Sequence, residues 1–230
     1  MLKAHITPLF TKFSNSKVGL FLLNKKFASK FQNSSSYWEH RYRNNGNSGP
    51  GSYGAAAGYK ATILNRFVKE HAINKVVEFG CGDGNQLKLY EFNSYIGYDV
   101  ADSCVQKCKM LFENEGDKLF FLYNPACFKV LPETIAHLTI SIDVVYHLIE
   151  DNIYHFYMNH LFETSEKYVI IYAWDVDSGQ RQHVKHRKFS KWIETYKSGW
   201  QLSNIISSEP KGKHCDFFIY KKVSSSKTKE

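Results

Sequence analysis

The sequence has no long hydrophobic run and no paired cysteine motif. Its longest uncharged apolar stretch is the six residues 18–23, whereas a membrane-spanning helix needs about 20 such residues. The five cysteines are an odd number without a C-x-x-C pair, a pattern that neither a disulfide framework nor a four-ligand zinc site would produce. We therefore predict a soluble chain with reduced, mostly buried thiols and no metal site.

Acidic residues are absent from one end of the chain and scarce at the other. Residues 1–38 contain six lysines and no acid, and residues 210–230 contain six lysines against two acids. Residues 39–209, with 18 basic and 20 acidic side chains, are close to neutral, so the net charge of +8 comes from the two ends. Nucleic-acid-binding domains gather lysine and arginine on one folded surface. This distribution therefore weakens a nucleic-acid interpretation.

The first 36 residues also lack arginine, and they end in the triple serine 34–36, which is typical of a linker. A mitochondrial transit peptide fits the absence of acids and the serine content, but such segments are normally rich in arginine. A basic arm that lies on an anionic membrane or on a protein partner is a second interpretation, and a plain extension is the third. The transit peptide would place the protein in the mitochondrial matrix, and the others in the cytoplasm.

Short β-like runs alternate with helical stretches from residue 75 onward. The runs are 75–79, 94–98, 119–123, 138–142 and 168–174, and the helical stretches include 104–113 and 152–163. This alternation predicts a parallel sheet with helices on both faces. Two further runs, 200–206 and 216–223, have no helix between them and predict an antiparallel C-terminal hairpin at the sheet edge. The fold class is therefore α/β, a Rossmann-like, seven-stranded, mostly parallel sheet.

We expect four parts in the chain. They are a basic, acid-free leader or arm over residues 1–36, an N-terminal lid and helix over 37–72, a Rossmann-like domain over 73–223 and a flexible tail over 224–230. In the second part, a loop rich in glycine, serine and asparagine precedes a helix predicted over residues 60–71, whose apolar side chains share one face.

The strongest chemical signal is KVVEFGCGDGNQL at residues 75–87, a buried strand followed by a glycine loop and the expected start of a helix at Asn85. Three glycines in five residues let a ligand approach main-chain amides at a helix N-terminus. The dinucleotide fingerprint needs a third glycine or an alanine where Asn85 stands, so the NAD version fails. What remains is an acidic residue followed by alternating glycines, filled by Glu78, Gly80, Gly82 and Gly84.

This pattern resembles the first motif of class I S-adenosylmethionine-dependent methyltransferases. The resemblance extends over residues 37–222 through YWEHRY at 37–42, GNSGPGSYG at 46–54, SIDVVYHLIED at 141–151 and HVKHRKF at 183–189. Together these segments look like small methyltransferases associated with bacterial polysaccharide or other glycan modification. The resemblance implies S-adenosylmethionine as the cofactor.

The resemblance also implies a set of cofactor contacts. Asp99, which ends the second strand, would hold the ribose hydroxyls, and Asn124 stands where many relatives carry an acid that contacts the adenine. Trp38 and Arg41 would belong to a lid that closes over the cofactor. The implied cofactor-binding residues are Glu78, Gly80, Cys81, Gly82, Gly84, Asp99, Val100, Asn124, Asp143, Trp38 and Arg41.

Methyl transfer depends mainly on holding the acceptor in line with the methyl group. If the acceptor is a hydroxyl, a base must take its proton, and His147 is the catalytic candidate because histidine titrates near neutral pH. Alternatively, His147 only bonds a backbone carbonyl. The candidate substrate-binding residues are Tyr146, His183, His186 and Arg187, of which the last three suit a phosphate or carboxylate on the acceptor. Alternatively, these three form a solvated, charged helix start.

We expect O-methylation of a small molecule or glycan by direct displacement. The central part of the chain is not basic, and the asparagine-proline loop of adenine-methylating enzymes is absent after the fourth strand, where Ile142 and Asp143 stand instead. Two alternatives remain. One is an RNA or protein methyltransferase guided by the basic tails, and the other is a non-catalytic, methyltransferase-like scaffold subunit in a larger assembly.

Overall fold

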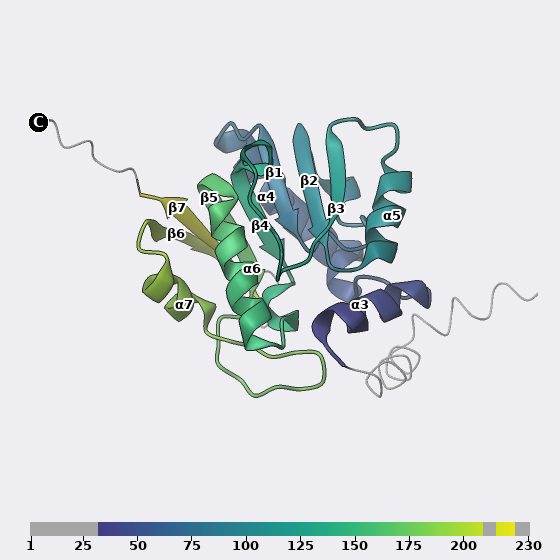
Figure 1. Ribbon diagram of the computed structural model, residues 1–230. Coiled ribbons are helices and arrows are strands. Elements are labelled where there is room, and N and C mark those ends of the chain that lie inside the picture. The colour runs from purple at the N-terminus through teal and green to yellow at the C-terminus, as the bar shows by residue number, and fades with distance from the viewer. Residues whose placement is uncertain (1–31, 209–214, 224–230) are drawn as a thin grey trace, which may run out of the picture.

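The computed structural model describes residues 32–208 and 215–223 (Figure 1). Most of the leader, residues 1–31, and the tail, residues 224–230, lie outside the described residues, and so do the predictions made for them.

Seven strands form one sheet in the order β3-β2-β1-β4-β5-β7-β6. The strands are β1 Lys75–Phe79, β2 Ser94–Asp99, β3 Lys118–Leu122, β4 Ala136–Ile142, β5 Ser165–Ala173, β6 Trp200–Ile206 and β7 Asp216–Lys222. Strands β1 to β5 pair in parallel, whereas β7 lies between β5 and β6 and is antiparallel to both. This confirms the predicted mostly parallel sheet with its antiparallel hairpin, whose first strand, β6, forms the edge.

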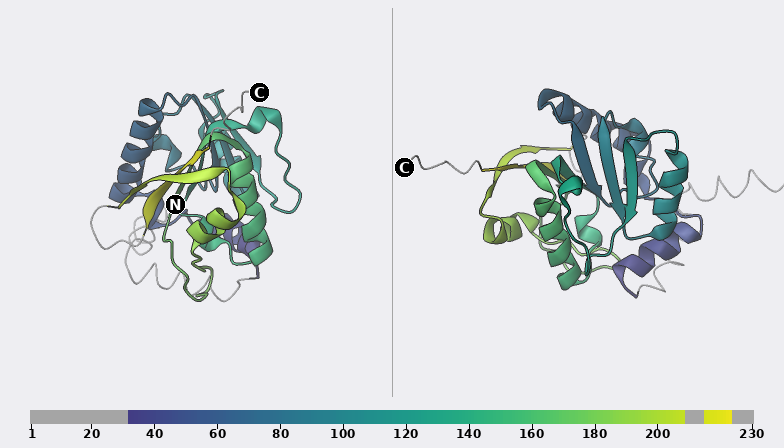
Figure 2. Two further views of the ribbon diagram at one scale, coloured as in Figure 1. Left: turned by 90° about the vertical axis from the view of Figure 1, so that its left-hand side faces the viewer. Right: turned by 45° about the horizontal axis from the view of Figure 1, so that its top comes forward.

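Helices cover both faces of the sheet, as predicted (Figure 2). The helices are α3 Ser34–Arg43, α4 Gly54–Glu70, α5 Asp102–Leu111, α6 Asp151–Glu163 and α7 Phe189–Tyr196, with the 3-10 turns η1 Pro50–Ser52, η2 Leu87–Leu89, η3 Pro132–Thr134 and η4 Val145–His147. Helices α4 and α5 pack with Val76 in one core layer, and α6 and α7 pack with Val77 in the other. Neighbouring residues of β1 therefore face opposite layers, as strand geometry requires.

The helix predicted to begin at Asn85 does not form. Turns and the single 3-10 turn η2 take its place. Nδ2 of Asn85 donates to the Ser52 carbonyl at 2.8 Å, and Nε2 of Gln86 donates to the Ala57 carbonyl at 2.9 Å. These side chains bind the segment that precedes β1 instead of starting a new helix, and α4 supplies the helical cover on this side of the core.

Two other boundaries differ from the prediction. Helix α4 begins at Gly54, not at residue 60, because residues 55–57 are alanines, the residue with the highest helix propensity. The triple serine is no linker but the first turn of α3, and the side chain of Asn33 caps this turn by accepting a hydrogen bond from the Ser36 amide at 2.8 Å. Helix α3 therefore begins at Ser34, inside the predicted leader.

Helix α3 crosses the edge of the sheet at which the parallel strands end (Figure 1). No helix among the described residues is long and apolar enough to cross a bilayer. The prediction of mostly buried thiols is confirmed, since Cys81, Cys104 and Cys108 are buried, Cys215 is half-buried and Cys127 is exposed.

Candidate active site

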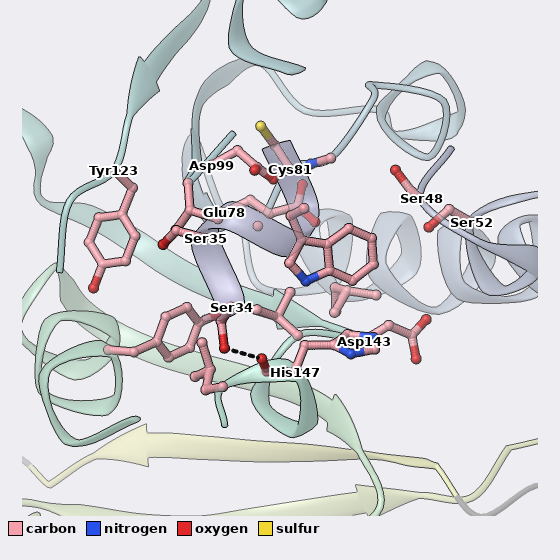
Figure 3. A pocket seen from close by; sticks show the side chains of 18 of the residues that line it. Ser34, Ser35, Ser48, Ser52, Glu78, Cys81, Asp99, Tyr123, Asp143 and His147 are labelled. Carbon is pink, nitrogen blue, oxygen red and sulfur yellow. Dashed lines mark hydrogen bonds between the residues drawn. The ribbon is translucent and has the colours of Figure 1, made fainter. Parts of the chain in front are cut away.

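A cavity lies between α3 and the carboxyl ends of β1, β2 and β4 (Figure 3). In Figure 3, Asp99 and Glu78 lie together on one side of the cavity, and Asp143 and His147 lie on the other. Eight of the predicted cofactor residues line this first cavity: Trp38, Glu78, Gly80, Cys81, Gly82, Asp99, Val100 and Asp143. The sequence pattern and the strand order therefore bring most of the predicted set to one place.

A second cavity adjoins the first. The two share Trp38, Ser48, Asp143 and His147. The second cavity extends away from the glycine loop to Arg41, Tyr146 and His183. Two of the four predicted substrate residues, Tyr146 and His183, therefore line a cavity next to the first one.

Two predicted cofactor residues lie outside both cavities. Gly84 packs on α5, because a Cβ at this position would lie 3.1 Å from the sulfur of Cys108. Asn124 is exposed, and its Oδ1 accepts a hydrogen bond from the Ala126 amide at 3.1 Å, so it shapes the turn after β3. The preceding residue, Tyr123, lines the first cavity instead.

Arg187 and His186 also lie outside the cavities. The guanidinium of Arg187 donates to the carbonyls of Leu148 and Ile149 at 2.5 and 2.7 Å and to Asp151 at 2.6 Å. It therefore fastens the loop between η4 and α6. The ring of His186 packs behind the second cavity, with its centroid 5.3 Å from that of Tyr146 and 5.0 Å from that of Trp174.

The glycine loop passes between two walls with no room for side chains. A Cβ on Gly80 would lie 2.4 Å from Val144, and one on Gly82 would lie 2.4 Å from the hydroxyl of Ser48. Both glycines have positive φ angles, 87° and 58°, which other residues rarely adopt. The main chain is therefore exposed to the first cavity here.

Two buried carboxyl groups stand at the ends of β1 and β2. Asp99 accepts hydrogen bonds from the amides of Gly82 and Ala101, both at 2.9 Å. Burial raises the pKa of Asp99 to about 6 even though these bonds lower it. Glu78 accepts a hydrogen bond from the Tyr95 hydroxyl at 2.6 Å, and burial raises its pKa to about 7. A cation bound beside these groups would favour their charged forms.

The loop over residues 46–54 is tied to the glycine loop by Asp83, which the sequence reasoning missed. Its carboxylate accepts hydrogen bonds from the Ser48 amide at 3.2 Å and from the Tyr53 hydroxyl at 2.5 Å. Burial would raise the pKa of Asp83, but the hydrogen bonds from Tyr53 and Ser48 outweigh it and the pKa is lowered. Asp83 lies within the glycine motif itself, and this position was the signal by which the sequence could have identified it.

The sequence reasoning also missed a buried ion pair. Nζ of Lys60, a residue only 1% exposed, lies 2.5 Å from Oδ2 of Asp143. The hydroxyl of Tyr146 donates to the other carboxylate oxygen at 2.9 Å. Lys60 follows Ala57 by three residues and precedes Leu64 by four, so it lies on the apolar face of α4, and this placement was the available signal.

His147 lies half-buried between the two cavities and is neutral. Its Nδ1 lies 3.0 Å from the carbonyl oxygen of His183. A carbonyl only accepts, so Nδ1 carries the proton and Nε2 carries the lone pair. Burial is the main cause that lowers the pKa of His147 to about 3, and the positive charge of Arg41 contributes to this lowering. The sequence offered His147 either as a catalytic base or as the partner of a backbone carbonyl, and both interpretations are compatible with this geometry. The hydrogen bond to the His183 carbonyl fixes the tautomer and leaves Nε2 for a ligand.

Helix α3 is fastened near its start and in its middle. The Ser34 amide donates to Glu150 at 2.8 Å, and the Ser34 hydroxyl lies 2.6 Å from Glu150. The same hydroxyl lies 2.9 Å from the carbonyl of His147 (Figure 3). Farther along α3, Glu39 accepts hydrogen bonds from the amide and hydroxyl of Ser103, both at 3.1 Å. These contacts hold α3 over the first cavity.

In the part of the chain that the structure describes, no three histidine, cysteine, aspartate or glutamate side chains lie close enough together to hold a metal ion.

No family model matches the sequence, and no curated protein matches it either. Solved structures do match the fold. The N-methyltransferase NodS from Bradyrhizobium japonicum WM9, in complex with S-adenosyl-L-homocysteine, superposes with a TM-score of 0.64 and 13% identity, over 83% of this chain and 99% of NodS. This chain has the fold of S-adenosylmethionine-dependent methyltransferases.

Two further structures agree. Magnesium protoporphyrin IX methyltransferase (ChlM) from Synechocystis PCC 6803, with bound SAM, gives a TM-score of 0.54 and 11% identity, over 96% of this chain and 99% of ChlM. The methyltransferase domain of bacterial CtHen1-C gives a TM-score of 0.56 and 18% identity, over 73% of this chain and 98% of that domain. At these identities the likeness establishes the methyltransferase fold.

Proposed function

We propose that this chain is an S-adenosylmethionine-dependent methyltransferase that methylates an oxygen of a small molecule or glycan. The observation that carries the proposal is the first cavity. In this cavity, the main chain of the glycine loop is exposed without side chains next to the carboxylate of Asp99 at the end of β2. Polar and aromatic residues of the lid lie over them.

The residues of the first cavity fit this cofactor. Oε1 of Gln86 is buried and has no hydrogen-bond partner among the described residues, and Gln86 lines the cavity together with Ser52 and Glu78. Buried acceptors are normally satisfied, so this oxygen is suited to the ammonium group of the cofactor's methionine part. Binding of a cation there would also lower the raised pKa of Glu78.

The nucleoside part has its own candidates. Both carboxylate oxygens of Asp99 accept backbone hydrogen bonds, and because a carboxylate has about four lone-pair sites, acceptor capacity remains for a ribose hydroxyl. Val100 and Tyr123 line the cavity beyond Asp99, so they would pack beside the adenine. Tyr123 thus takes the place that the sequence resemblance gave to Asn124.

When bound, S-adenosylmethionine supplies a methyl group activated by a positively charged sulfur. Helix α3 with Trp38 excludes water from both cavities, and Tyr146 and His183 orient the acceptor in the second one. His147 takes the proton of the acceptor hydroxyl on Nε2. Its low pKa is compatible with this role, because an oxygen that is gaining a methyl group becomes far more acidic than a free alcohol.

Calorimetry with S-adenosyl-L-homocysteine tests the proposal. We expect the full chain to bind one equivalent, and Asp99→Asn to weaken binding about tenfold or more, because a charge-assisted hydrogen bond is worth about 1.5–3 kcal/mol. The matched control is Asp102→Asn, an exposed aspartate in the first turn of α5, which should bind like the unaltered chain. Absence of binding by the unaltered chain would leave the scaffold interpretation instead.

A further inference from the structure

Arg41 of α3 is a buried cation that lacks an acidic partner. It is 9% exposed, and no carboxylate among the described residues forms an ion pair with it. Its Nε donates to the carbonyl of Asn47 at 2.7 Å, and its Nη1 lies 3.4 Å from the hydroxyl of Tyr37. Both are neutral groups. Buried charges are normally paired, so the surroundings of Arg41 are complete only when an anion is present.

The other charges around the second cavity do not supply that anion. Asp143 is neutralised by Lys60. The carboxylate of Asp83 lies behind Ser48, where its oxygens accept hydrogen bonds from backbone amides and from the Tyr53 hydroxyl. Burial lowers the pKa of His147 to about 3 and that of His183 to about 4, with the charge of Arg41 contributing to both, so both rings are neutral. Among the described residues that line the second cavity, Arg41 is therefore the only cation without a paired carboxylate.

A second group in the same cavity points to the same chemistry. Nδ1 of His183 is buried and has no hydrogen-bond partner among the described residues. The His183 ring stacks on Tyr37 at a centroid distance of 4.3 Å, which holds it next to the helix that carries Arg41. A neutral imidazole can place its proton on Nδ1 and donate from there. The second cavity is thus lined by a buried cation and by a histidine with an unused ring nitrogen, from two segments far apart in the sequence.

We propose that the second cavity binds an acidic group of the methyl acceptor, a carboxylate or a phosphate, with Arg41 as its ion-pair partner and His183 as a hydrogen-bond donor. This inference rests on the proposed methyltransferase function and narrows its substrate class to acidic small molecules or acidic glycans. The sequence assigned an anion site to Arg187, but that guanidinium is occupied by backbone carbonyls and Asp151. Arg41, rather than Arg187, is therefore the arginine that binds the anion.

The competing anion is the carboxylate of the cofactor's own methionine part, because the sequence resemblance placed Arg41 among the cofactor-binding residues of the lid. The first cavity does not favour it, because Arg41 does not line that cavity, whereas Ser48 and Ser52 do. The two assignments differ in which affinity falls when the guanidinium of Arg41 is removed. If Arg41 binds the acceptor, the affinity for acceptor-type anions falls. If it binds the cofactor, the affinity for the cofactor falls.

The test uses the full chain saturated with S-adenosyl-L-homocysteine and three probes: inorganic phosphate, acetate and neutral acetamide. We expect phosphate or acetate to bind at least fivefold more tightly than acetamide, and the comparison of the two identifies the preferred anion. Arg41→Met should abolish that preference while the affinity for S-adenosyl-L-homocysteine stays within twofold. The matched control is Arg43→Met on the same helix, whose side chain is 70% exposed and pairs with Glu39. It should bind all three probes like the unaltered chain.

Two results would overturn the proposal. One is an anion preference that is missing from the unaltered chain or that survives in Arg41→Met. The other is a large loss of S-adenosyl-L-homocysteine affinity in Arg41→Met with the probes unaffected. If Arg41→Met fails to fold, as judged by circular dichroism, Arg41→Lys takes its place and should retain only part of the phosphate affinity, because lysine lacks the bidentate fork. Failure of the unaltered chain to bind S-adenosyl-L-homocysteine would contradict the methyltransferase function itself and is a separate outcome.

Discussion

The chemistry proposed for this site depends on how burial alters single residues. His147 in water would be half protonated near pH 6.5, but burial lowers its pKa to about 3, so the ring stays neutral throughout the physiological range. The bond from Nδ1 to the His183 carbonyl also fixes the tautomer. A base of this kind acts through its position rather than through strong basicity.

Replacement of His147 tests that role. His147→Gln keeps a donor for the His183 carbonyl and removes the Nε2 lone pair, so we expect turnover to fall about 100-fold, the lower range for loss of a general base. The affinity for S-adenosyl-L-homocysteine should stay within twofold. The rate of the unaltered enzyme should show no step near pH 6.5 from this residue. His137→Gln, at the far end of β4, is the control, and unaltered turnover in His147→Gln would remove His147 from the mechanism.

Glu78 predicts a pH dependence of stability. Its pKa in the folded protein, about 7, lies above the ordinary value of 4.5, so its favourable contribution is complete below pH 4.5 and is lost as the pH rises through 7. Glu78→Gln lacks this loss. Relative to Glu78→Gln, the free energy of unfolding of the unaltered protein should therefore fall by about 3 kcal/mol over this range.

Urea unfolding of both proteins at pH values from 4.5 to 7.5, without cofactor, measures this difference. His147 also titrates, but it is common to both proteins and cancels in the comparison. Asp99 interacts electrostatically with Glu78, so its titration differs between the two proteins and belongs to the measured difference. Parallel stability curves would show that Glu78 does not change its protonation state in this range.

At the scale of elements, α3 covers the first cavity, and we expect access to the site to depend on it. It is held by contacts between Ser34 and the loop at residues 147–150, including a bond from the Ile149 amide to the Ser34 hydroxyl at 3.1 Å. The sequence motif around Trp38 predicted a lid, but not these contacts. They join serines that looked like a linker to a loop more than 110 residues away.

Ser34→Ala should loosen the lid. It removes a buried hydroxyl whose hydrogen bonds are worth about 1–3 kcal/mol, so we expect S-adenosyl-L-homocysteine to dissociate about tenfold faster in stopped-flow tryptophan fluorescence. The control is Ser36→Ala, an exposed serine of the same turn, which should leave the rate unchanged. Equal dissociation rates in both variants would mean that α3 does not control release of the ligand.

For the glycine loop, the sequence pattern predicted the loop itself but not the structure that follows it. The motif predicted the loop correctly, and its glycines adopt the positive φ angles for which glycine is suited. The helix expected to follow it is missing, because Asn85 and Gln86 donate to backbone carbonyls of Ser52 and Ala57. A polar side chain at such a position either begins a helix or forms hydrogen bonds with a distant segment. Which of the two occurs depends on partners that the local sequence pattern does not contain.

At the scale of the whole molecule, most of the excess positive charge and the seven-stranded sheet lie in different parts of the chain. The seven-stranded sheet lies within residues 39–223, where basic and acidic side chains nearly balance up to residue 209, and most of the excess lysine belongs to the two ends. An acceptor bound in the second cavity would not need those ends.

Removal of residues 1–31 and 224–230 separates the substrate classes. For a small-molecule or glycan acceptor, we expect S-adenosyl-L-homocysteine affinity and turnover to stay within twofold, with a shallow dependence on salt. Loss of acceptor binding, together with a steep salt dependence in the full chain, would favour an RNA or protein substrate guided by the basic tails. Calorimetry and a methyl-transfer assay at two salt concentrations measure both quantities.

The sequence by itself determined the strand periodicity, the glycine crossing and the strand-end carboxylate Asp99, because these depend on residue types at short, fixed spacings. Only the tertiary structure decided which charges meet. Lys60 pairs with Asp143 across 83 residues, Arg187 is used by the backbone of a distant loop, and Arg41 is left without an acid. Charge pairing acts through space over a few ångströms, and the strand order, rather than the spacing of residues along the chain, sets which side chains come that close.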